Sequence, residues 1–230
     1  MIDQATTLLA AGTDWAQLRP RMIDAFGETL WMVSLTMLIG GLAGLIMGVA
    51  LFTTRRSGIL PSGPVHTALN LLVNLVRPIP FIILVTAMGP ITKTAVGSTI
   101  GTEAAIFVMS VAASFAVARL VEQNLVSVDP GIIEAARAMG ASPWRIIRDV
   151  IVPEALGPLI LGYTFAFIAV VDMSAMAGYI GGGGLGDFAI VYGYRAFDWN
   201  VTLVTTLIIV LIVQAAQILG NLLARRVMRR

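Results

Sequence analysis

The stretch Asp129–Pro158, DPGIIEAARAMGASPWRIIRDVIVPEALGP, is the longest part of the chain that does not suit a lipid bilayer, and apolar runs flank it on both sides. Asp129 followed by Pro130 is typical of a helix start, with an N-cap residue and a proline at the first helical position. Gly140 is typical of the residue just past a helix end. The pattern predicts a helix of about ten residues.

A second helix start follows at Ser142 and Pro143. It predicts a short helix over Trp144 to Val150, which Pro153 ends before the next apolar run. The stretch is thus expected to form two short helices that meet at a glycine.

Small side chains surround Glu134 in the first of these helices, where Ala135, Ala136 and Ala138 allow another protein to approach the backbone closely. Such a surface suits a plug that docks into a partner better than it suits a catalytic pocket. The alternative is a membrane-surface loop with incidental alanines.

Composition places the rest of the chain in a membrane. Of the 230 residues 57% are hydrophobic and 12% are charged, against about 45–50% apolar residues in soluble domains. The net charge of +2 is too small to indicate a nucleic-acid partner. Cysteine is absent and His66 is the only histidine, which argues against thiolate or imidazole metal sites. We expect no cofactor in this chain.

The fold class expected is all-α, a polytopic bundle of five transmembrane helices forming a single domain over 28–223. Residues 1–27 are expected to be an extracytoplasmic lead-in, helical from Trp15, 122–157 a cytoplasmic loop, and 224–230 a basic cytoplasmic tail. The predicted spans cover 29–52, 68–88, 99–121, 158–180 and 201–223.

Several residues inside the spans have a predicted role. Gly40, Gly44 and Gly48 recur at the spacing of a helix-packing face. Arg77 and Pro80 lie where prolines interrupt the second span, and Arg77 is expected near the cytoplasmic interface. Arg119 and Glu122, three residues apart, are expected to pair.

Asp172 lies near the middle of the fourth span, and an ionisable group at that depth is a functional-site hypothesis. The alternative is a neutral aspartic acid bonded to a neighbouring helix. Met173, Ser174 and Met176 follow it, and flexible methionines suit a constriction that must repack when it opens. We hypothesise that Met176 and Met173 form a gate beside Asp172.

Orientation follows from the basic residues. Eleven lie on the side of the Glu134 loop and the C-terminus, and four, Arg19, Arg21, Lys93 and Arg195, lie on the other. The bias predicts a cytoplasmic C-terminus and an N-terminus outside.

No nucleotide-binding loop and no Ser/His or Cys/His pair is evident. Energy for active transport would therefore enter through a partner at the Glu134 loop. Five helices are few to enclose a solute route, and a two-fold homodimer would supply ten.

The loop spacing resembles the cytoplasmic motif E-A-A-x3-G-x9-I-x-L-P of ABC importer permeases, with Glu134, Ala135, Ala136, Gly140 and Pro153 at the matching positions and valines in place of isoleucine and leucine. Further matches, Arg77 to Leu84, Ser174-Ala175-Met176 with Gly184-Leu185-Gly186, and Tyr192-Gly193-Tyr194, resemble the permease subunits of methionine ABC importers.

The resemblance implies an inner-membrane type I importer permease without enzymatic activity. It implies a homodimer bound to two ATPase subunits, which hold ATP and Mg, and fed by an extracytoplasmic methionine-binding protein. Coupling to the ATPase is expected at Glu134, Ala135, Ala136, Ala138, Gly140, Ala141 and Pro153.

Three other functions are alternatives. The first is a permease for another solute, such as a betaine, a phosphonate or another amino acid. The second is a channel or proton-coupled carrier in which Asp172 titrates, which leaves the Glu134 loop unexplained. The third is an intramembrane protease, for which neither a second aspartate at matched depth nor a serine with a base is visible.

Overall fold

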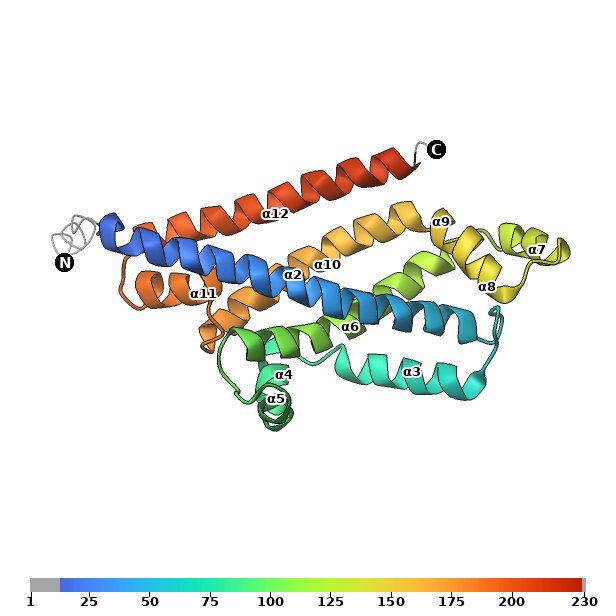
Figure 1. Ribbon diagram of the computed structural model, residues 1–230, viewed down its shortest axis with the longest axis horizontal. Coiled ribbons are helices and arrows are strands. Elements are labelled where there is room, and N and C mark those ends of the chain that lie inside the picture. The colour runs from blue at the N-terminus through green and yellow to red at the C-terminus, as the bar shows by residue number, and fades with distance from the viewer. Residues whose placement is uncertain (1–12, 229–230) are drawn as a thin grey trace. The chain divides into compact units, whose positions relative to one another are not determined.

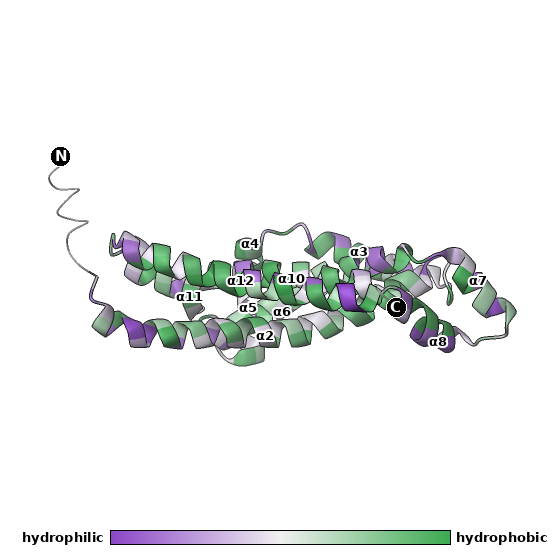
Figure 2. Ribbon diagram, turned by 90° about the horizontal axis from the view of Figure 1, so that it is seen from above, coloured by the Kyte–Doolittle hydropathy of each residue, from purple (hydrophilic) through white to green (hydrophobic). Residues whose placement is uncertain are grey.

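A computed structural model describes residues 13–228, which are helical and contain no β-strand (Figure 1). Four helices are long and apolar enough to cross a membrane. They are α2 (Trp15–Thr54), α6 (Thr102–Val126), α10 (Leu156–Tyr179) and α12 (Trp199–Met228). Hydrophobic residues run along these helices in Figure 2. The all-α membrane class expected from composition is confirmed.

The remaining predicted span is a bent pair of helices. Helix α3 (Gly63–Val76) and helix α4 (Phe81–Ala87) meet at an angle of 104°. Pro78 and Pro80 fall in the break, as expected of residues that interrupt the helical hydrogen-bond ladder. A short helix, α5 (Gly89–Val96), follows. The spans number five only when the bent pair is counted as one.

Arg77 lies at this bend, as the cap residue of α3. The 14 residues of α3 correspond to about 21 Å of helix. Arg77 is therefore about that far along α3 from the loop after α2, and its place near the cytoplasmic interface stays a prediction. Even without Arg77, ten basic residues against four favour the predicted orientation.

The first long helix begins at Trp15, as expected, but it runs without a break through the first predicted span to Thr54. No separate element covers residues 15–27. Gly27 is the one glycine between Trp15 and the start of the span, and a single glycine costs a helix only about 1 kcal/mol.

The chain divides into two compact units, each with a core of its own. The first unit comprises Met1–Leu35, Phe81–Met109 and Ala169–Ala215, and Leu185, Phe188 and Val201 are buried in its core. The second comprises Thr36–Pro80, Ser110–Ile168 and Ala216–Arg230. Phe52, Leu125, Ile146 and Ile151 are among the residues at its centre.

The glycine stripe of α2 packs as predicted, within the second unit. A β-carbon on Gly44 would lie 2.6 Å from Val117 Cβ, and one on Gly48 would lie 2.6 Å from the carbonyl oxygen of Ala118. Both neighbours belong to α6. Glycine is needed here because any side chain would separate the two helices.

The glycine run ends α10 within the first unit. Gly181, Gly183 and Gly184 have φ of +85°, +81° and +77°, a region that favours glycine. The Gly184 N–H donates to Glu28 Oε2 at 2.7 Å, and the Leu185 N–H donates to Thr29 Oγ1 at 2.8 Å. These side chains cap the short helix α11 (Gly184–Phe188), which continues into a π-helical segment, η2 (Ala189–Tyr194).

Candidate functional site

The loop after α6 opens with helix α7 (Pro130–Ala138). Asp129 Oδ1 accepts a hydrogen bond from the Gly131 N–H at 2.8 Å, so Asp129 is the N-cap of α7, as the sequence predicts. Pro130 occupies the first turn, where its missing N–H costs nothing. The helix is nine residues long, close to the length expected.

The two faces of α7 differ. Ile133 and Ala136 are buried in the core of the second unit, with 9% and 4% of their surface exposed. Glu134, Ala135 and Ala138 are exposed. Ala136 is therefore not part of the exposed surface around Glu134, and its place in the core anchors the helix instead.

Gly140 forms the turn after α7, as the sequence predicts. Its φ is +77°, and its N–H donates to the carbonyl oxygen of Arg137 at 2.9 Å. The half-buried Ala141 donates its N–H to the carbonyl oxygen of Ala136 at 3.1 Å. These bonds satisfy carbonyls at the helix end, and the left-handed backbone is one that glycine adopts without strain.

The second helix of the loop is longer than predicted. It runs through α8 (Pro143–Arg145), a π-helical turn, η1 (Ile146–Ile151), and α9 (Val152–Glu154). Pro153 does not end it, because it stands in the first turn of α9, where a missing N–H is tolerated. Its side chain is exposed. A π-helical turn of this kind is often found at functional sites.

Two large apolar side chains on the loop were missed at the sequence level. Met139 is 81% exposed and Trp144 is 68% exposed. They flank the Gly140 turn. The signal was available, because two large apolar residues stand five positions apart in a loop expected outside the membrane, and grouped exposed apolar residues mark interaction sites.

The loop is tied to the body of the second unit by Arg137. Its Nη2 donates to the carbonyl oxygen of Gly58 at 2.9 Å, in the connection between α2 and α3. A shift of α7 would therefore reach that connection directly.

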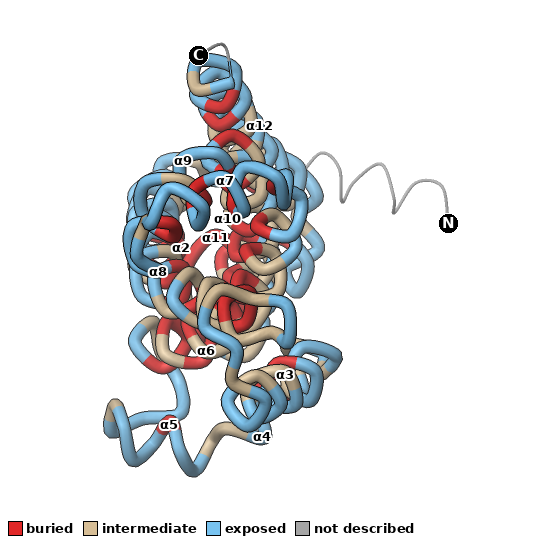
Figure 3. Tube along the Cα trace, turned by 90° about the vertical axis from the view of Figure 1, so that its right-hand side faces the viewer, coloured by how far each residue is buried: buried red, intermediate tan, exposed pale blue. Residues whose placement is uncertain are grey.

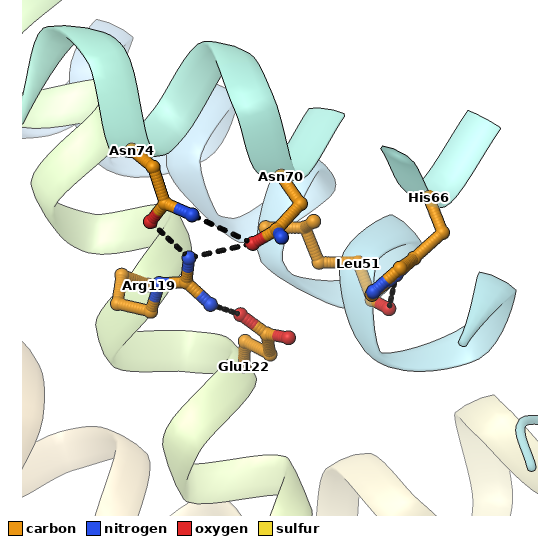
Figure 4. Close-up of polar contacts among 6 residues, drawn as sticks. All are labelled: Leu51, His66, Asn70, Asn74, Arg119 and Glu122. Atoms are coloured by element: carbon orange, nitrogen blue, oxygen red, sulfur yellow. Dashed lines mark hydrogen bonds and ion pairs between the residues drawn. The ribbon is translucent and has the colours of Figure 1, made fainter. Parts of the chain in front are cut away.

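A polar cluster joins α3 to α6 in the second unit (Figure 4). Arg119 Nη1 lies 2.6 Å from Glu122 Oε2, which confirms the predicted pair. Arg119 Nη2 donates to Asn70 Oδ1 at 2.7 Å and to Asn74 Oδ1 at 2.5 Å. The asparagines, four residues apart on α3, were missed as its partners. Their spacing on one helix face was the available signal.

The four residues proposed for a gate differ in exposure. Asp172 and Met176 are exposed, Met173 is half-buried, and Ser174 is 2% exposed. The Ser174 hydroxyl donates to the carbonyl oxygen of Val171 at 2.7 Å, so it is satisfied within its own helix. Asp172 and Met176, four residues apart, share a helix face.

The carboxylate of Asp172 makes no hydrogen bond or ion pair to any residue between 13 and 228. A bond to a neighbouring helix of the same chain therefore gains no support. Among the same residues no group of three or more His, Cys, Asp or Glu is placed to hold a metal ion.

Comparison with known families decides the class of protein. Residues 40–229 match the family described as "Binding-protein-dependent transport system inner membrane component". The chain belongs to this family. The match includes the loop with its EAA motif, the polar cluster and the residues around Asp172.

Relatives within this inner-membrane family are similar over most of their length. The chain is 43% identical over 209 residues to a probable D-methionine transport system permease protein MetI of Vibrio cholerae, covering 91% of this chain and 93% of the relative. It is 39% identical over 180 residues to the methionine import system permease protein MetP of Bacillus subtilis, covering 78% and 81%.

The fold is also that of a solved transporter subunit. A chain from inward-facing conformations of the MetNI methionine ABC transporter matches with a TM-score of 0.88 and 38% identity, covering 94% of this chain and 99% of the other. The type I importer fold expected from the resemblance is confirmed, and so is its multi-pass membrane character.

Proposed function

We propose that this chain is the membrane-spanning permease subunit of an ATP-driven importer that carries methionine, in its L- and D-forms, into the cytoplasm. The observation that carries the proposal is the near full-length similarity to permeases named for methionine import. ATP and Mg bind to a partner ATPase and not to this chain. An extracytoplasmic methionine-binding protein delivers the substrate.

The permease works as a homodimer. Helix α12 is apolar and mostly exposed (Figure 3), with 11% of its most hydrophobic window buried. It also exposes Gln214 and Asn221. Polar groups such as these and Asp172 are costly against lipid. A second copy, with a water-filled route between the two, would cover them.

The coupling surface consists of Glu134, Ala135, Ala138 and Gly140, extended by Met139 and Trp144. The small side chains let an ATPase groove approach the α7 backbone, and the two exposed apolar side chains supply area to bury. Ala136 and Ala141 hold the loop in shape behind this surface, and Pro153 is exposed where the loop passes into α10. Movement of the loop reaches α10, and with it Asp172 and Met176, through η1 and α9.

The C-terminus and the loop face the cytoplasm, and the N-terminus lies outside, in agreement with the basic residues. The chain has no cysteine, so a single cysteine in place of Ser142 can be labelled without background. We expect an impermeant maleimide to reach it in inside-out vesicles only. Labelling in intact, right-side-out cells would show that the loop lies outside and that the orientation is the opposite one.

The function is tested by reconstituting the chain with its ATPase and binding protein in vesicles and measuring uptake of labelled L- and D-methionine. We expect ATP-dependent uptake that unlabelled methionine competes away. If a betaine, a phosphonate or another amino acid competes and methionine does not, the chain is still a permease but its substrate belongs to that other class. Uptake by the chain alone, driven by a pH gradient, would favour a carrier that uses Asp172.

A further inference from the structure

A pocket of about 580 Å³ opens where helix α10 begins and helix α12 ends, within the second unit. Pro153, Glu154 and Gly157 line it from one side, and Arg226 and Met228 line it from the other. Arg226 and Glu154 are both exposed, so the pocket has a free cation and a free anion at its rim, with no ion pair between them in the described chain.

An apolar groove of about 420 Å³ continues from this pocket between the same two helices, with α2 contributing to one wall. Leu156 lines both the pocket and the groove. Leu159, Phe167 and Leu219 are typical of the remaining lining, which is almost entirely apolar. The volume lies within the range of about 300–1,000 Å³ that ligand pockets occupy.

Small residues hold the helices at the spacing that makes the groove. Met228 lies against Gly157 at the polar end, and Thr164 lies against Gly220 farther along. A β-carbon at either glycine would overlap these neighbours. The groove is therefore formed by the packing of α10 and α12 and needs no ligand to open it.

Basic charge is concentrated at the polar end. Arg226 follows Arg225, and the sequence closes with Arg229 and Arg230, so four arginines stand within the last six residues. Four or more basic residues directly after a membrane helix attract the phosphates of lipid headgroups, by about 1 kcal/mol each.

The groove lies on a different face of α12 from its polar residues. At about 100° per residue, Ala216, Leu219, Gly220 and Leu223 are centred roughly 130° away from Gln217 and Asn221. Arg226 falls on the groove side and Arg225 on the polar side. A second copy that covers the polar face therefore leaves the groove facing lipid.

From these observations we infer that the pocket and groove bind one phospholipid of the leaflet that meets the C-terminus. Its phosphodiester lies at Arg226 and one acyl chain lies in the groove against Leu156 and Phe167. Because Pro153 and Glu154 line the headgroup pocket, the bound lipid contacts the point where the exposed loop passes into α10. It would therefore restrain movement of that junction.

The test is native mass spectrometry of the full chain purified in detergent and titrated with phosphatidylglycerol or phosphatidylethanolamine, which share the phosphodiester. We expect one lipid per chain to stay bound after weak annular lipids are removed. Arg226→Gln should weaken this binding about fivefold. Arg225→Gln, the matched control, should stay within about twofold because that side chain is on the other face.

The groove is tested by Ala216→Phe, which fills it without changing charge, and by glycerol phosphate, which has the phosphate but no acyl chain. We expect Ala216→Phe to abolish retention of the lipid while the oligomeric state is unchanged, and glycerol phosphate not to compete. Equal losses in the two arginine variants would overturn the site. Retention of the lipid by the Ala216→Phe variant would also overturn it. If Ala216→Phe instead dissociates a dimer, a second copy fills the groove and the proposal is wrong.

Discussion

Gly140 has a left-handed backbone, with φ of +77°, and open space where a side chain would point. A substitution there acts through strain and not through a clash within the chain. Gly140→Ala should lower the stability of the loop by about 1–2 kcal/mol, and the β-branched Gly140→Val should do more harm. We expect both to reduce ATPase binding, measured by co-purification, while the chain still inserts in the membrane.

Gly27→Ala is the matched control for this prediction. Gly27 also has open space around its β-position, but it lies in a helix with ordinary φ. Alanine there should leave ATPase binding unchanged and raise stability slightly. If the Gly140→Val variant binds the ATPase and transports normally, the turn has no role in coupling.

Asp187 provides a prediction about pH. Burial raises the pKa of its carboxyl, the nearby Glu28 raises it further, and Arg195 lowers it. A pKa raised in the folded protein means that the contribution of Asp187 to stability is fully present below its unfolded pKa. That contribution is lost as pH rises through the folded value. In the Asp187→Asn variant, the midpoint of thermal unfolding should fall less with rising pH in mildly acidic buffer than it does in the unmodified protein. The same pH dependence in both proteins would contradict the assignment.

At the scale of elements, the Arg119 cluster fixes α3 against α6. Glu122→Gln would leave the guanidinium partly buried without its counter-charge, which costs about 3–5 kcal/mol when a buried pair is broken. We expect a marked fall in the midpoint of thermal unfolding in detergent. The double variant Arg119→Met with Glu122→Leu, which removes both charges, should recover much of the lost thermal stability. A double variant as unstable as Glu122→Gln would mean that the asparagine contacts matter more than the charge.

Prediction of the elements from sequence succeeded where the signal is local. Asp129, Gly140 and the glycine stripe of α2 each act on neighbours along one helix or one helix pair. The 104° bend between α3 and α4 was only half predicted. Prolines reveal that a helix is interrupted but not how far it turns.

Long-range effects account for the rest. Pro153 looked like a helix end, but the preceding π-helical turn lets the helix pass through it. The burial of Ala136 depends on a core assembled from distant segments, which no local pattern specifies. The spacing of Asn70 and Asn74 indicates a polar face on α3, but their pairing with Arg119 depends on the packing of α3 against a distant helix.

At the scale of the whole molecule, Asp172 and Met176 share an exposed face of α10. Met176 is 41% exposed in the single chain, and a polarisable, flexible side chain on a face shared with an aspartate suits an apolar constriction between two copies. We expect a lone cysteine in place of Met176 to cross-link to its two-fold mate when the route is closed. The link should stop transport, and a reductant should restore it.

The control is a cysteine in place of Ile46, which is 70% exposed on α2. We expect this side chain to face lipid, so the cysteine should neither cross-link nor affect transport. Met176→Ala should raise leakage of substrate because it removes the side chain that fills the constriction. If the cysteine at position 176 forms no cross-link while the Ile46 control behaves as expected, and Met176→Ala transports normally without leakage, then Met176 is a packing residue. The route must then close elsewhere along the dimer.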